Sequence, residues 1–234
     1  MRHRHRNRRF ALPLLIALAT SLLIVSDSGA TEPYSLRGFR LGIALAEFKA
    51  MQVPDQDIWP GARPLCFSDR EAKAPGTMSA DDGIRLSEAE KQAGIGRCGF
   101  FHPAGGVLAP AGLVIANARA AVSFVFVPDR EGTLRLAAIE ATTASSNYDS
   151  IKAALVKKYG RPKSAMKGYA LDAAGSRLVD ETAKWSNEVS DIKLDRREED
   201  KDIQRMLIEY THEELAADGL KRLKAIQGNS ANTL

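Results

Sequence analysis

Alternating apolar and polar positions predict a β-hairpin in the middle of the chain. Val122, Phe124 and Phe126 share one side of a predicted strand, and residues 128–132 supply the turn. The same alternation returns over residues 134–138. Valines lie between the phenylalanines. We therefore expect this strand to be covered on both faces and to be central in its sheet.

A helical period follows the hairpin. The apolar positions of one face are Tyr148, Ile151, Leu155 and Tyr159. Ser146 and Asp149 have the spacing of a capping box, Gly160 stops the helix and Pro162 prevents its resumption. The pattern predicts a helix over residues 147–159.

Shorter patterns predict the remaining elements and an α+β fold. The predicted strands cover residues 36–40, 99–101, 113–116, 182–186, 192–194 and 206–210. The predicted helices cover residues 44–51, 87–93 and 211–226, the last opened by a second capping box at Thr211 and Glu214. Strands grouped by hairpins between helices predict an antiparallel sheet. The helix-then-hairpin order suggests a tandem duplication, with units over 31–144 and 145–228 and a disordered tail over 229–234, although no residue-level repeat relates the halves.

The amino terminus has the pattern of a secretory signal peptide. Five arginines precede an apolar run over residues 10–25, and small residues end at Ala30. The run is shorter than the ~20 residues of a spanning helix. We expect cleavage after Ala30, export by the general secretory route and a periplasmic location, with an uncleaved anchor as the alternative. No cysteine lies near the cut, which excludes lipid attachment there.

The net charge resides in the amino-terminal segment. The whole chain carries +4, and residues 1–30 account for all of it. The remaining chain has 28 basic and 28 acidic side chains. No basic stripe is left to bind nucleic acid. Eight consecutive charged residues, 195–202, are expected to form a solvated hairpin end.

Cys66 and Cys98 are the only cysteines, and both follow the predicted signal peptide. An even cysteine count in an exported chain predicts a disulfide. It would close a loop of roughly 33 residues, which corresponds to about 3–4 kcal/mol. A redox pair usually has C-x-x-C spacing and a zinc site needs about four ligands, and neither pattern is present.

The segment GIGRCG, residues 94–99, has the spacing of a dinucleotide-binding loop. Such a loop needs a strand before it and a helix after it. Here a polar, helical pattern precedes the glycines, and Phe100 to Gly106 cannot start a helix of that kind. We expect no nucleotide cofactor, and we expect the glycines to turn the chain around Cys98.

Three patches resemble an uncharacterised family of exported proteobacterial proteins. They are the opening FRLGIALAEF (39–48), the helix end YDSIKAALVKKYGRP (148–162) and the WSN turn (185–187). The helix-then-hairpin order is similar to that of the β-lactamase-inhibitor protein and of the small lipoprotein of the outer-membrane assembly machine. The resemblance implies a domain that binds other proteins through a sheet face, and it supplies no catalytic residues.

Sequence motifs for catalysis or metal binding are missing. His102 precedes a proline in a predicted loop, and His212 opens HEELA, which lacks the second histidine of H-E-x-x-H. Trp185, within a predicted strand, is assigned to the core.

These patterns favour a non-catalytic domain that binds another protein of the cell envelope, without cofactor or metal and with no membrane span after signal cleavage. The alternatives are a hydrolase that uses carboxylates and a small-ligand carrier. Two acids with shifted pKa values in a pocket would favour the hydrolase, an exposed apolar sheet face would favour protein binding, and an enclosed apolar cavity would favour the carrier.

Overall fold

The computed structural model describes residues 31–73, 84–171, 175, 177–197 and 204–231. The chain divides into Met1–Ala30 and Thr31–Leu234, and the second is one compact unit. The predicted signal peptide and most of the charged run 195–202 lie outside the described residues. No helix of the described part is long and apolar enough to cross a membrane.

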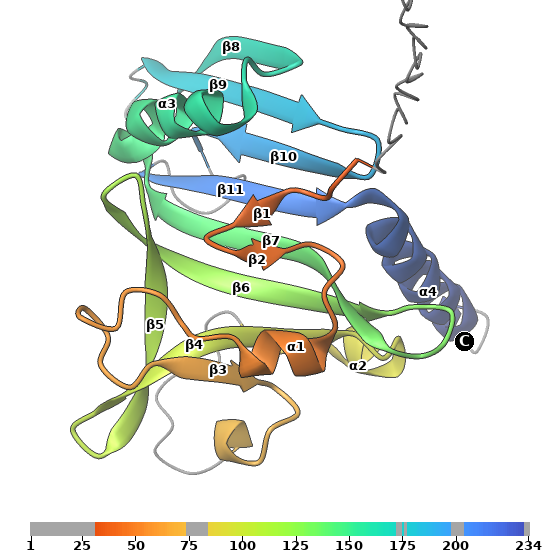
Figure 1. Cartoon of the computed structure of the whole chain (residues 1–234). Coiled ribbons are helices and arrows are strands. Elements are labelled where there is room, and N and C mark those ends of the chain that lie inside the picture. Colours follow the sequence, from red (N-terminus) through yellow and green to blue (C-terminus); the bar gives the residue numbers. More distant parts are fainter. Residues whose placement is uncertain (1–30, 74–83, 172–174, 176, 198–203, 232–234) are drawn as a thin grey trace, which may run out of the picture. The chain divides into compact units, whose positions relative to one another are not determined.

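A nine-stranded antiparallel sheet organises the described residues, with the strand order β3-β4-β5-β6-β7-β11-β10-β9-β8 (Figure 1). Its strands are β3 (Arg63–Cys66), β4 (Gly96–Ala104), β5 (Val107–Ile115), β6 (Ala118–Pro128), β7 (Leu134–Ala144), β8 (Ser164–Leu171), β9 (Arg177–Ser186), β10 (Ser190–Asp195) and β11 (Arg205–His212). A separate two-stranded ribbon consists of β1 (Ser35–Leu36) and β2 (Phe39–Arg40). The helices are α1 (Leu45–Ala50), α2 (Glu88–Gln92), α3 (Tyr148–Tyr159) and α4 (Glu213–Ala231), with 3-10 turns at Glu71–Lys73 and Ser145–Asn147. The α+β class and the antiparallel sheet are confirmed, and a duplication is not shown.

Both predicted units contribute to this one sheet. Strands β3 to β7 come from residues 31–144, and β8 to β11 come from residues 145–228. The pairing of β7 with β11 joins the two groups.

One face of the sheet, here called the core face, packs against α1, α3 and the β1–β2 ribbon. Phe48 of α1 lies 4.7 Å from Phe124 of β6 between ring centroids, and Phe39 of the ribbon lies 5.2 Å from the same ring. The buried side of α3 joins this cluster, as does Trp185, which is 1% exposed. The prediction that Trp185 belongs to the core is confirmed.

The opposite face, here called the polar face, is covered by α4 at one end. Leu215 of α4 packs with Val127, Ala137 and Ile95 in a second apolar cluster. Helix and strand approach closely at Gly219, where an added Cβ would lie 3.0 Å from a methyl of Val127. Strand β6 is therefore packed on both of its faces, with valines on the polar face and phenylalanines on the core face, as the sequence predicted.

The central hairpin and α3 are confirmed, but both capping-box predictions are wrong. Asn147, not Ser146, precedes α3, and it makes no side-chain cap because Ser145–Asn147 forms a 3-10 turn that leads into the helix. Thr211 lies inside β11, which stays paired with β10 through His212. The capping box that does form is at Ser87 and Glu90 of α2.

Several boundaries also differ from the sequence predictions. Helix α4 runs to Ala231, beyond its expected end at 226 and into the segment expected to be a disordered tail. Strands β3 and β8 had no prediction. The expectation that the glycines of GIGRCG turn the chain around Cys98 is wrong, because Gly96 and Gly99 lie within β4 and only Gly94 has a positive φ.

Candidate functional site

A row of polar side chains crosses the polar face where α4 does not cover it. Strand pairing aligns Ser123 of β6 with Glu140 of β7, Glu140 with Glu209 of β11, and Glu209 with Lys193 of β10. The alternate residues of these strands are buried in the core face. Register alone therefore places these four side chains, here called the polar row, on one surface.

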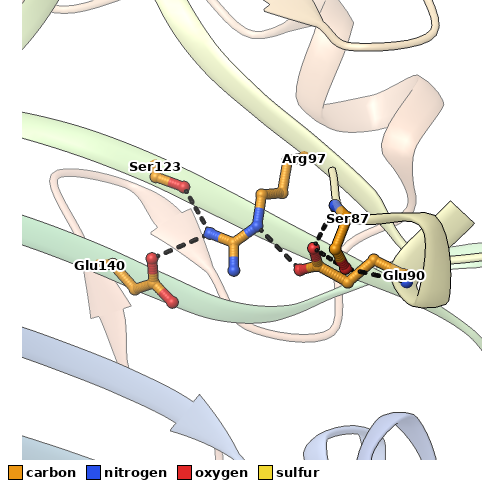
Figure 2. A network of polar contacts seen from close by, with 5 residues as sticks. All are labelled: Ser87, Glu90, Arg97, Ser123 and Glu140. Carbon is orange, nitrogen blue, oxygen red and sulfur yellow. Dashed lines mark hydrogen bonds and ion pairs between the residues drawn. The ribbon is translucent and has the colours of Figure 1, made fainter. Parts of the chain in front are cut away.

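Arg97 of β4 anchors one end of the polar row (Figure 2). Its guanidinium donates to the Glu140 carboxylate at 3.0 Å, to Ser123 Oγ at 3.3 Å and to Glu90 Oε1 at 3.2 Å. The other Glu90 oxygen accepts from the backbone N–H and the hydroxyl of Ser87, each at 2.8 Å. The capping box of α2 is thus tied through Arg97 to the centre of the sheet.

Burial and charge pairing shift the pKa values of Arg97 and Glu90 in opposite directions. The Arg97 side chain is 22% exposed and that of Glu90 is 19% exposed. Burial disfavours the charged form of both groups, but their hydrogen bonds and ion pairs have the larger combined effect. Glu140 and Glu90 raise the pKa of Arg97, while Ser87 and Arg97 lower the pKa of Glu90. The hydrogen bond from Arg97 fixes the position of the Glu140 carboxylate.

Glu209 lies beside Glu140 without such support. Among the described residues it makes no hydrogen bond and no ion pair, and the neighbouring Lys193 pairs with Asp195 at 2.8 Å. Burial raises the pKa of Glu209, and the charge of Glu140 raises it further against the opposing effect of Lys193. The two adjacent carboxyls therefore differ in their surroundings: Glu140 is bound by Arg97, whereas Glu209 is half-buried and has a raised pKa. Neighbouring acids in unlike surroundings are a starting point for an acid–base pair.

A pocket of about 360 Å³ lies between the β6–β7 turn and the start of α4. Its lining residues are Gly42, Asp129, Arg130, Glu131, Arg135, His212, Glu214, Leu215 and Asp218. Arg135 binds Asp129 at 2.6 Å, and Arg130 binds Glu214 at 3.0 Å. The hydrogen bond from Arg135 and those from the turn backbone lower the pKa of Asp129. Leu215 is the only large apolar residue of this lining, and six of the nine lining residues are of charged types, so this pocket differs from the enclosed apolar cavity expected of a carrier.

The two histidines of the described residues, His102 and His212, lie apart from the polar row. His212 is the last residue of β11, directly before α4, and it is half-buried; burial lowers its pKa. His102 lies in β4 rather than in a loop. Within the described residues no group of histidines, cysteines and acids could hold a metal ion.

The predicted disulfide is present. Cys66 of β3 and Cys98 of β4 are directly opposite in the register and are joined, and both are buried. The bond clamps the short strand β3 at one edge of the sheet.

The other edge carries exposed apolar side chains. Four large apolar residues of the described chain are exposed, and three of them lie on the β8–β9 hairpin. They are Met166 (72% exposed), Tyr169 (59%) and Val179 (37%), while the fourth, Leu220, lies on α4. Among the described strands, β8 pairs with β9 on one side and with no strand on the other. No residue pattern had predicted this hairpin edge, because its side chains do not alternate.

Comparison of the chain with protein-family models, curated proteins and solved structures finds no match. The resemblance to the exported proteobacterial family, and the partner class that it implies, therefore stay predictions.

Proposed function

We propose that this chain is a non-catalytic, protein-binding domain of the cell envelope and that it binds its partner through the β8–β9 hairpin. The observation that carries the proposal is the gathering of exposed apolar side chains on this one edge. Apolar groups that face water gain free energy when a partner covers them. The open side of β8 also offers unpaired backbone groups to a partner.

A periplasmic location agrees with two features of the chain. Its disulfide is consistent with an oxidising compartment. Its amino terminus has the basic and apolar pattern of an export signal. A partner in the same compartment would be another envelope protein.

Position-specific crosslinking in cells tests the proposal. A photoreactive amino acid is placed at Met166 or at Tyr169, and at Leu220 as a matched exposed apolar position on α4. We expect both hairpin positions to capture the same envelope protein and Leu220 not to capture it. The purified partner should then bind the wild-type chain, and the Met166→Ser, Tyr169→Ser variant should bind it several-fold more weakly.

Two outcomes would contradict the proposal. The first is capture that is the same at all three positions, and the second is a purified partner that binds wild type and the hairpin variant equally. The variant should fold, because exposed substitutions usually change the free energy of unfolding by no more than ~0.5 kcal/mol. Its thermal midpoint provides the control.

The Glu140–Glu209 pair favours a second candidate function, a hydrolase that uses carboxylates. Glu209 would be the proton donor and Glu140 the carboxylate that activates water or attacks directly. A panel of chromogenic glycosides and esters tests this candidate, with Glu209→Gln and Glu140→Gln as variants and Glu47→Gln on α1 as the control. Activity of wild type that both site variants lose would support it. No activity of wild type, or activity that the site variants retain, would reject it.

A further inference from the structure

Strand β8 presents an open edge with a definite chemistry. Resting on the proposed protein-binding function, we propose that the partner contributes an extended acidic segment that pairs with β8 as an additional strand of the sheet. Its acidic side chains would lie on the core face of the sheet and its apolar side chains on the polar face. The position of β8 at the end of the strand order, next to β9 alone, provides the edge (Figure 1).

Charge selects an acidic segment. Residues 161–171 contain Arg161, Lys163 and Lys167 and no acid. Lys167 is exposed and, within the described chain, makes no hydrogen bond or ion pair, and its charge helps to lower the pKa of Glu181 opposite it on β9. A second copy of this chain would bring the same cations to the edge, and like charges on adjacent strands repel. The charge therefore favours a different chain of opposite charge over self-association.

Strand register assigns the cations to one face. Lys167 is opposite Glu181, whose carboxylate binds Lys152 of α3, so Lys167 lies on the side of α3, the core face. Tyr169 follows two residues later on the same face. Arg177 stacks over the Tyr169 ring, with its Cζ 4.2 Å from the ring centroid. An added strand would therefore meet two cations on the core face.

On the polar face of the sheet, the side chains that β8 contributes to this edge are apolar or small. Met166 is opposite Thr182, whose hydroxyl donates to Asp195 on the polar face. Gly168, two residues later, adds no side chain. An added strand would cover Met166 with an apolar side chain beside the space left by Gly168. Because side chains alternate along a strand, the partner segment should alternate acidic and apolar residues.

A defined peptide tests this pairing on the intact oxidised chain. The probe is the capped heptapeptide Val-Glu-Val-Glu-Val-Glu-Val, and its counterpart has Lys in place of Glu. In the isotope-labelled protein, alternate backbone amides of 164–171 bond to β9 and the others face outward. We expect the Glu peptide to slow hydrogen exchange of the outward-facing amides only. We also expect it to bind roughly five-fold or more tightly than the Lys peptide.

A charge reversal provides the matched control. Lys167→Glu should invert the preference, so that the Lys peptide binds more tightly, whereas Lys49→Glu on α1 should leave the order unchanged. Peptide binding without protection of alternate β8 amides would overturn strand addition. An unchanged preference in Lys167→Glu would overturn the charge assignment. Crosslinking from Met166 and Tyr169 tests the protein-binding function independently of the peptide experiment. If it captures a specific partner but the peptide does not bind, this inference is wrong and the protein-binding function stands.

Discussion

Reduction of the disulfide should lower the stability of the fold by a predictable amount. Cys66 and Cys98 are separated by 32 residues. Closing a loop of this length restricts the unfolded chain by an entropy that corresponds to about 3.7 kcal/mol at 25 °C. For a domain of this size each kcal/mol shifts the thermal midpoint by roughly 2–4 °C, so we expect reduction to lower it by about 7–15 °C. The bond also holds β3, which within the described part of the chain pairs with β4 alone.

Thermal unfolding followed by circular dichroism, with and without a phosphine reductant, measures this effect. Reduced and oxidised wild type share one sequence, so the comparison involves no substitution of a side chain. The Cys66→Ala, Cys98→Ala variant is the control, and its midpoint should not respond to the reductant. A shift below about 3 °C in wild type would refute the loop-closure reasoning. It would mean that the reduced, unfolded chain is already restricted or that β3 contributes little to the cooperative unit.

Three further substitutions test the packing and charge of the sheet by urea unfolding. Gly112→Ala would place a Cβ 2.1 Å from the carbonyl oxygen of Ala120, so we expect the free energy of unfolding to fall by about 3 kcal/mol or more. The control is Gly168→Ala, where the nearest atom to an added Cβ is at 4.0 Å, and it should change the free energy of unfolding little. Ser87→Ala removes the cap of α2 and should cost about 1 kcal/mol; no loss would mean that Glu90 holds the helix alone. Glu209→Gln should stabilise the fold near pH 7 and have a vanishing effect in acid. The raised pKa of Glu209 means that the folded state binds the proton more tightly, so wild type loses stability as pH rises from the unfolded pKa, about 4.3, through the folded pKa. An equal effect of this substitution at pH 4 and pH 8 would contradict the assignment.

The elements that could be predicted from the sequence are those whose signals are local. The β6–β7 hairpin alternates because one of its faces packs in the core while the other carries Ser123 and Glu140, and α3 has a helical period because one side packs on the core face. The disulfide followed from cysteine count and export pattern. The hairpin and the helix need only neighbouring residues to be recognised, and the disulfide needs only a count of cysteines, because two cysteines allow a single pairing.

Strand β8 had no such signal, because an exposed edge strand need not alternate. Gly168 and small residues interrupt its pattern, and Met166 and Tyr169 are exposed. The predicted capping box at Thr211 did not form, for a related reason. The hydrogen-bonded ladder between Ser190 and His212 extends β11 past Thr211, and tertiary pairing overrides the local preference for a helix start.

The glycines in β4 and directly before it have two different structural roles. Gly94 has φ +72° and turns the chain before the strand. Gly99 is extended, and a Cβ there would lie 3.1 Å from a methyl of Ile84. The motif spacing suggested one role for all three glycines, whereas turn formation and close packing are separate roles that only the fold distinguishes.

The polar row depends on register, which the sequence leaves open. Its members come from strands far apart in the chain, and Glu140 meets Glu209 only because β7 and β11 pair with Ala141 opposite Ile208 and Ile139 opposite Tyr210. A slip of β11 by one residue would exchange its two faces, moving the buried Ile208 and Tyr210 to the surface and Glu209 into the core. Burial of those apolar neighbours therefore fixes the position of the acids. The same apolar residues that stabilise the sheet bring two carboxyls together, and burial beside Glu140 raises the pKa of Glu209. A substitution that weakens the pairing of β7 with β11 should for this reason change the titration of Glu209 before it unfolds the protein.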